Sequence, residues 1–247
     1  MSEQNQATAS GRLPYVRAGV IDTLPLVLAA VPFGILYGAL AQSQGLPFWA
    51  IMMMSLCVFA GAAQFVTIGL LAVNTPPSVI AITIFVLNLR HLLYAVSLMP
   101  QAARFPQRWR ILLGFWLTDE TFATVSTRLG RYRLDPGLLW YWLASGGFMY
   151  GSWNLCSLLG ARLSQDMPDL THWGLEVAMV VAFVGMVVPS LKRPSHVCCA
   201  LTAGVMILLT FNWPNNTGLL VTTLVAVAVG LGMEYCQKPE VEAEVSS

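Results

Sequence analysis

The sequence predicts an all-α protein, a polytopic membrane helix bundle with about seven to eight spans. Of its 247 residues, 56% are hydrophobic and 10% are charged, whereas soluble domains carry about 25% charged residues. The mean hydropathy is +0.66. Apolar runs of the length that a helical span needs, about 20 residues, also recur along the chain. Such a chain cannot solvate its own surface, so we expect an integral membrane protein.

Eight apolar runs define the expected spans. They cover residues 18–42, 47–73, 77–99, 110–130, 137–162, 173–191, 195–213 and 216–236. We expect residues 1–16 to form a polar N-terminal tail, residues 17–237 the transmembrane domain and residues 238–247 an acidic C-terminal tail. The N-terminal tail lacks an apolar core, so the first run should remain as a span instead of acting as a cleaved signal peptide.

Some of these spans contain residues that interrupt helices. Pro25 and Pro32 fall inside the first run and Gly61 inside the second. Proline removes a helix hydrogen bond and kinks the axis, and broken helices at membrane depth occur where they are buried or line a cavity. We therefore expect breaks at Gly or Pro, which in transporters often form the binding site. The alternative is that the small residues around Gly61 only allow close helix contact.

Basic residues indicate the orientation of the bundle, because loops rich in Lys and Arg stay in the cytoplasm. With eight spans and a cytoplasmic N-terminus, eight basic residues lie inside and four outside. Three of those four are arginines between Pro100 and Ile111. The rule favours this orientation, but these arginines indicate that one span is re-entrant or miscounted.

Polar and charged side chains lie inside three of the runs. They are Gly61 and Gln64, then Asn88, Arg90, His91 and Tyr94, then Asp119 and Glu120. A charge in hydrocarbon costs roughly 2.5–3.5 kcal/mol on insertion scales, so such residues usually face a cavity or a partner. We predict that these eight residues form a substrate-binding or coupling site. A purely structural ion pair, and helix–helix hydrogen bonds from Asn88 or Gln64, are the alternatives.

The helical period suggests how the charges are arranged. Arg90 carries a planar fork of donors that matches a carboxylate, which predicts an ion pair with Asp119 or Glu120. These two acids diverge by about 100° on a helix, so only one should pair with Arg90. Thr118 before them is an N-cap candidate, which predicts a helix start in the middle of a span. The unpaired acid is the candidate for a proton-coupled step, with His91 as a candidate relay.

Three motifs resemble those of a known family. They are Ala60-Gly61-Ala62-Ala63-Gln64-Phe65, Arg90-His91-Leu92-Leu93-Tyr94 and Leu117-Thr118-Asp119-Glu120-Thr121-Phe122-Ala123. In this order they are similar to the motifs of the AzlC family, the large subunit of bacterial branched-chain amino acid exporters (AzlC/AzlD or YgaZ/YgaH type). The resemblance covers roughly residues 14–231.

This resemblance implies a secondary transporter in the bacterial cytoplasmic (inner) membrane. Its substrates would be leucine, isoleucine and valine, with methionine as a further candidate, and its direction would be efflux. The resemblance also implies a small AzlD-type membrane subunit as partner.

Other functions find less support in the residues. The sequence has no P-loop, so any pumping must use an ion gradient or exchange. We expect no cofactor and no metal, because the five cysteines lie in or beside apolar runs and the three histidines lack ligand spacing. A net charge of +1 argues against a nucleic-acid partner. A passive channel for small solutes remains an alternative. An intramembrane enzyme using Ser97 and His91 lacks a supporting motif.

Overall fold

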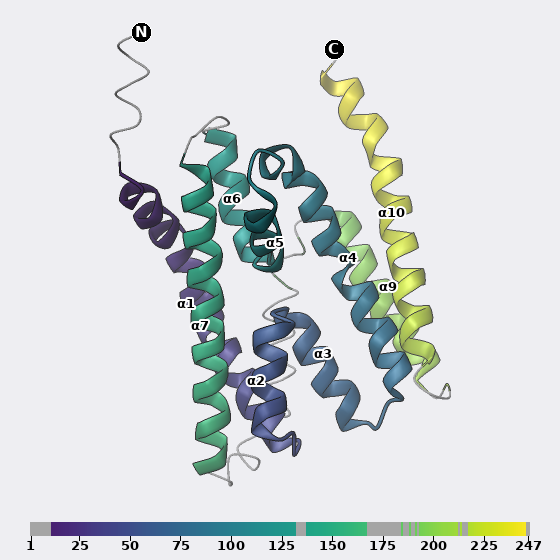
Figure 1. Cartoon of the computed structure of the whole chain (residues 1–247). Coiled ribbons are helices and arrows are strands. Elements are labelled where there is room, and N and C mark those ends of the chain that lie inside the picture. The colour runs from purple at the N-terminus through teal and green to yellow at the C-terminus, as the bar shows by residue number, and fades with distance from the viewer. Residues whose placement is uncertain are drawn as a thin grey trace. The chain divides into compact units, whose positions relative to one another are not determined.

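The computed structural model describes residues 11–131, 137–166, 193–211 and 217–245, and the isolated positions 184, 188, 191 and 213. These residues form helices joined by turns, with no strand among them, which confirms the all-α prediction. The helices are α1 (Leu13–Ser43), α2 (Phe48–Cys57), α3 (Gly61–Ala72), α4 (Pro77–Ala102), α5 (Gln107–Phe115), α6 (Asp119–Arg131), α7 (Leu138–Asp166), α9 (Pro194–Thr210) and α10 (Thr217–Val245) (Figure 1). By length and composition, α1 and α4 can cross a bilayer.

Prolines mark several helix starts. Pro14 lies in the first turn of α1, Pro77 opens α4 and Pro194 opens α9, while Pro47 and Pro106 immediately precede α2 and α5. Proline suits these places because its missing N–H would have no helical partner there and its fixed φ already fits a helix. The places where these helices begin are therefore determined by neighbouring residues in the sequence.

The contacts divide the chain into two units. One holds residues 1–69 and 84–175, and the other holds residues 70–83 and 176–247. In the second unit, α9 and α10 form an antiparallel pair. Thr210 and Thr222 hydrogen-bond at 3.2 Å near the connection, and Arg193 pairs with Glu234 at 3.0 Å toward the other end. All the residues predicted to form the site lie in the first unit.

Helices α1 and α7 are the scaffold of the first unit, and they run parallel. Thr23 donates a hydrogen bond to Ser145 at 2.7 Å, and further along both helices Gly34 faces Cys156. Small residues let the backbones approach closely. At Gly160, for example, an added Cβ would collide with a carbonyl of α1.

Helices α2 and α3 form a hairpin on one half of α7 instead of a continuous span. The ring of Phe48, at the start of α2, stacks under Arg162 near the end of α7. At the other end of α2, the Leu56 carbonyl accepts a hydrogen bond from Tyr150 in the middle of α7 at 3.0 Å. The chain then turns, and α3 leads back toward the end from which α2 came (Figure 1).

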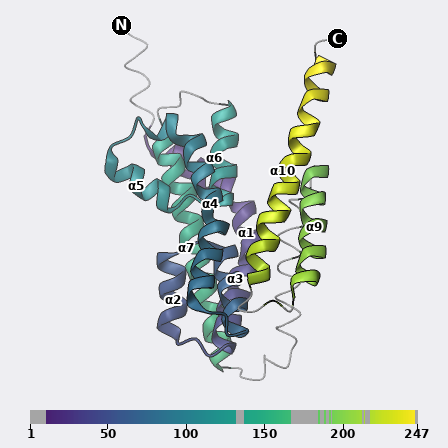
Figure 2. The same ribbon diagram turned by 90° about the vertical axis from the view of Figure 1, so that its right-hand side faces the viewer.

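Helices α5 and α6 form the opposite hairpin, on the other half of α7. Trp109 in α5 lies 6.2 Å from Trp140, ring to ring, near the start of α7. Trp116, after α5, packs on Gly146 closer to the middle. Helix α6 returns, and its Arg128 lies 4.9 Å above the ring of Tyr141. Figures 1 and 2 both show α2 and α3 at one end of α7 and α5 and α6 at the other.

The two hairpins have the same arrangement of elements but run in opposite directions along α7. Their breaks, at 58–60 and 116–118, have the same length and the same pattern of one turn residue followed by two irregular residues. Pro47 and Pro106 precede the first helix of each hairpin. A long helix comes before each hairpin: α1 before the first and α4, which runs in the opposite direction, before the second (Figure 1). The first unit therefore contains an inverted repeat of a long helix followed by a hairpin.

The runs 47–73 and 110–130 are broken in the middle, at 58–60 and 116–118, as Gly61 and Thr118 predicted. The break expected at Pro25 and Pro32 is wrong, because α1 is one continuous helix from Leu13 to Ser43 with both prolines inside it. A helix can continue through a proline when neighbouring helices and side chains satisfy the freed backbone groups.

Two helix ends also differ from the predicted bounds. Helix α1 begins at Leu13, inside the expected N-terminal tail, and α10 continues to Val245 through the expected C-terminal tail. Good helix formers among the last residues allow that extension. Most of the run 173–191 lies outside the described residues.

Candidate functional site

The start of α6 positions two acids at a helix break. Thr118 precedes the helix, and its side-chain oxygen accepts a long hydrogen bond, 3.4 Å, from the backbone N–H of Thr121. This is the geometry of an N-cap. Asp119 and Glu120 then occupy the first turn, where the helix dipole favours negative charge. The predicted helix start in the middle of this run is confirmed.

Asp119 is the acid that pairs with Arg90. Arg90 Nη1 lies 2.9 Å from Asp119 Oδ2, and the Tyr94 hydroxyl donates to Asp119 Oδ1 at 2.5 Å. The predicted ion pair is therefore present, but through one guanidinium nitrogen, because Tyr94 takes the second oxygen. Arg90 Nε is buried without a hydrogen-bond partner among the described residues. Donors of Arg90 thus remain for a further ligand.

Three more of the predicted residues lie on or beside this cluster. The His91 ring is 6.0 Å from the Tyr94 ring, which in turn stacks on Phe122 of α6 at 4.4 Å. The Asn88 Oδ1 atom is buried and has no partner within the described ranges. The Glu120 carboxylate forms no ion pair with another described residue, and the backbone carbonyl of Glu120 accepts a hydrogen bond from the Thr124 hydroxyl at 2.9 Å. The two acids thus have different surroundings.

Gln64 and Gly61 belong to a second cluster, at the start of α3. Gln64 is 1% exposed, and its Oε1 accepts a hydrogen bond from Trp153 Nε1 at 3.0 Å. Its Nε2 donor has no partner among the described residues. The Trp153 ring lies over Gly61, where an added Cβ would come within 2.8 Å of it, and stacks on Tyr37 at 6.2 Å.

An aromatic group that the sequence did not single out joins the two hairpin tips. The rings of Phe59, in the first break, and Phe115, the last residue of α5, lie 6.5 Å apart, and Tyr150 of α7 contacts both at 5.0 and 5.7 Å. Phe59 has a φ of 43°, a left-handed conformation that is strained for a bulky side chain and is typical of functional sites. The only sequence signal was an aromatic residue at each break.

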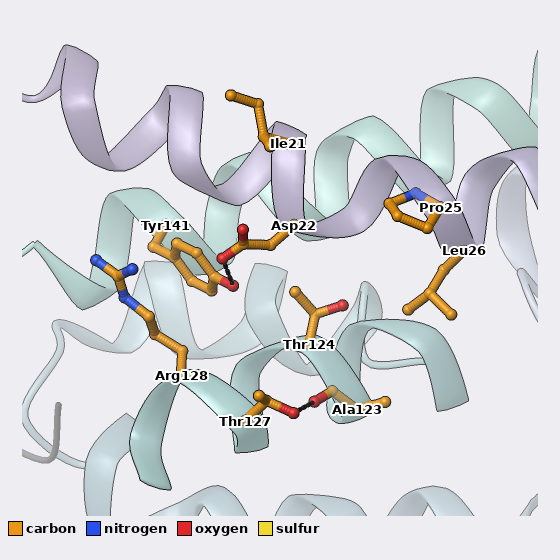
Figure 3. A pocket seen from close by; sticks show the side chains of 9 residues that line it. All are labelled: Ile21, Asp22, Pro25, Leu26, Ala123, Thr124, Thr127, Arg128 and Tyr141. Atoms are coloured by element: carbon orange, nitrogen blue, oxygen red, sulfur yellow. Dashed lines mark hydrogen bonds between the residues drawn. The ribbon is translucent and has the colours of Figure 1, made fainter. Parts of the chain in front are cut away.

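A cavity of about 450 Å³ lies among α1, α6 and α7, and neither Arg90 nor Asp119 lines it. Asp22 and Arg128 contribute its charges (Figure 3). Neither was among the predicted site residues, because each lies near the end of an apolar run, where a charged side chain can reach the membrane interface.

Long apolar helices, paired half-helix hairpins and an ion pair at a helix break define the class of this chain as a helical membrane protein. The chain belongs to the AzlC family: the family's pattern, described as "AzlC protein", matches residues 25–167. That range holds α2 to α7 and most of α1, so it includes both hairpins and both clusters. The predicted resemblance is confirmed.

Three relatives illustrate the family. An "Uncharacterized membrane protein" of Archaeoglobus fulgidus is 34% identical over 81% of this chain and 86% of its own length. The "Inner membrane protein YgaZ" of Escherichia coli is 27% identical over 73% of this chain and 75% of its own. The "Branched-chain amino acid transport protein AzlC" of Bacillus subtilis is 24% identical over 100% and 92%. No solved structure matches. The family is thus one of membrane proteins related to transport.

Proposed function

We propose that this chain is the large subunit of a secondary transporter that exports branched-chain amino acids across the bacterial cytoplasmic membrane. The observation that carries the proposal is the Arg90–Asp119–Tyr94 cluster at the start of a half-helix. Its separate cationic and anionic groups match the two charges of an amino acid. The family membership and the name of the Bacillus subtilis relative support the same substrate class.

The topology that follows has both hairpins re-entrant, from opposite faces of the membrane. In this arrangement α1, α4 and α7 cross the bilayer, and each hairpin returns to the face from which it started. Arg104, Arg108 and Arg110, which an eight-span count leaves outside, then lie on the side of the N-terminus. Trp140 marks that side, because Arg12 lies over its ring at 4.4 Å and Trp109 contacts it as well. The rule for basic loops then assigns this side to the cytoplasm.

Each part of the substrate has a complementary group. The free donors of Arg90 and the unpaired backbone N–H groups at the start of α3 can bind the carboxylate. Asp119 or Glu120 can accept the ammonium group. Aromatic residues at the hairpin tips supply an apolar wall for a branched side chain. The break residues of transporters commonly supply such groups.

The inverted repeat suggests how the site reaches both sides. In transporters built from such repeats, the two halves exchange conformations around a site near the membrane midplane. Here the hairpin tips meet at Tyr150, about halfway along α7. Movement of one hairpin against the other would open the site to one face at a time. Glu120 is the candidate proton carrier for coupling, with His91 as candidate relay.

A small AzlD-type subunit is part of the proposal. Helix α4 exposes an apolar stripe that includes Phe85, Leu92 and Val96, and Leu98 is its one fully buried residue. The side chains of Arg90 and Asp119 remain 29% and 41% exposed. Charges are costly in lipid, so a protein partner is better suited than lipid to cover this part of α4.

Counterflow of labelled leucine tests the proposal. The purified chain is reconstituted in proteoliposomes with and without the small subunit, and uptake of labelled leucine is driven by unlabelled leucine inside. We expect saturable counterflow with both subunits, competed by isoleucine and valine. A flux that neither saturates nor shows counterflow would favour a passive channel instead.

A further inference from the structure

The cavity among α1, α6 and α7 carries charges and hydroxyls that the Arg90 cluster does not use. Its volume is about 450 Å³, within the range of roughly 300–1,000 Å³ that is typical of small-molecule pockets. Asp22 from α1, Thr124, Thr127 and Arg128 from α6 and Tyr141 from α7 line it, and Figure 3 shows these side chains around one space.

Most of the polar groups in this cavity are acceptors. The Tyr141 hydroxyl donates its proton to Asp22 Oδ2 at 2.8 Å. Thr124 and Thr127 donate theirs to carbonyls of their own helix, those of Glu120 and Ala123, each at 2.9 Å. With their protons committed, the three hydroxyls present only lone pairs to a ligand.

Helix α1 has an interrupted hydrogen-bond pattern beside this cavity. Pro25 lines the cavity, and because proline has no N–H it cannot make the helix bond to the carbonyl of Ile21. Ile21 is also a lining residue. The carboxylate and the three hydroxyl oxygens together suit an ammonium group, which has three donors and no acceptor.

The opposite charge is supplied by Arg128. Its guanidinium lies 4.9 Å above the Tyr141 ring, and five N–H donors allow it to serve more than one acceptor. Apolar lining comes from Pro25, Leu26 and Ala123. A ligand with an ammonium group, an anionic group and a compact apolar body therefore finds a counterpart for each part.

We propose that this cavity is a second binding site for the amino acid, separate from the Arg90–Asp119 cluster and closer to the cytoplasm. The assignment of the ligand rests on the proposed function. Asp22 is nine residues from the start of α1, roughly 14 Å along the axis. Under the proposed topology the site would receive substrate from the cytoplasm before the mid-membrane cluster does.

A binding assay separates this proposal from the proposed function. The chain, with the small subunit if the complex requires it, is placed in nanodiscs of phosphatidylcholine and phosphatidylglycerol, and binding of tritiated leucine is measured directly. All variants start from Asp119→Asn, which should abolish transport. We expect this parent variant to retain saturable leucine binding. A parent that binds no leucine, when the wild type does, would overturn the second site and leave the proposed function standing.

Two substitutions and two analogues identify the contacts. Asp22→Asn and Arg128→Gln should each weaken leucine binding by about tenfold or more, the effect of one charge-assisted contact. Leucinamide, which lacks the carboxylate, should lose affinity only with Asp22→Asn. The analogue 4-methylpentanoate, which lacks the ammonium group, should lose affinity only with Arg128→Gln. Arg162→Gln is the matched control, because Arg162 also stacks on a ring, that of Phe48, at the other end of α7.

The analogues keep the test interpretable if a variant is partly misfolded, because misfolding would weaken all ligands together. Leucine binding that neither substitution weakens would overturn the proposal. An ethanolamine lipid headgroup carries the same pair of charges, so a parallel sample includes phosphatidylethanolamine. One outcome would assign the cavity to lipid and overturn the amino acid site. In it, the parent variant retains phosphatidylethanolamine and the Asp22→Asn variant does not, and samples without phosphatidylethanolamine bind no leucine.

Discussion

Gly61 should tolerate no side chain while Trp153 covers it. An added Cβ would lie 2.8 Å from Trp153 Cη2 and 3.1 Å from Cζ2, and contacts this short force a neighbour to move. The ring is held by its hydrogen bond to Gln64 and by stacking on Tyr37. Overpacking at such a site costs about 1–3 kcal/mol. Gly61→Ala should therefore destabilise the protein by about that amount and reduce leucine exchange.

Reversible unfolding in mixed detergent micelles measures this cost. Gly114→Ala is the control, because Gly114 lies in the other hairpin and has nothing within 4 Å of its added Cβ; its effect should stay within about 0.5 kcal/mol. Trp153→Phe removes the atoms that would collide, so Gly61→Ala should cost less in that background than in the wild type. Strictly additive effects of the two substitutions would refute the reasoning, since residues in contact should couple.

Three further predictions concern the scaffold, the ion pair and the partner. Gly160→Ala should destabilise the protein by about 3 kcal/mol or more, because the added Cβ meets the backbone of α1. Gly151→Ala on the same helix is the control and should be nearly neutral, because its added Cβ has nothing within 4 Å. Equal free energies of unfolding for the two variants would contradict the close packing of α1 on α7. Arg90→Ala should abolish leucine exchange, and adding Asp119→Asn should recover part of the lost stability because no lone charge remains; a double variant no more stable than the single one would argue against pairing. Expressed alone in cells without a small homologue, the chain should give little leucine efflux, and full efflux would remove the need for a partner.

The local features of the site were predictable from the sequence. Thr118, Asp119 and Glu120 form a helix-start signal that depends on neighbouring residues only, and the structure has that start. An arginine within an apolar run requires an anion, and Arg90 has one. The choice of Asp119 over Glu120 was not predictable, because it depends on where Tyr94 places its hydroxyl.

The hairpins were not predictable from composition. An apolar run of about 25 residues has the same composition whether it crosses the bilayer or turns back halfway. Gly61 and Thr118 predicted where the two runs break, and three arginines, Arg104, Arg108 and Arg110, lay on the wrong side of an eight-span count. Neither signal shows that the chain turns back at the break. The cavity among α1, α6 and α7 was not predictable either, because Asp22 and Tyr141 are 119 positions apart and only the packing of α7 on α1 brings them together.

The division of labour between the two acids is the central claim, and one pair of transport measurements tests it. Asp119→Asn and Glu120→Gln are reconstituted in the same way, and both leucine exchange at equal concentrations and uphill transport driven by a pH gradient are measured. Asp119→Asn should lose both activities, because Asp119 holds Arg90 and Tyr94. Glu120→Gln should keep exchange and lose only the gradient-driven transport. If both variants lose the two activities in the same proportion, the two carboxylates act as one unit and the account is wrong.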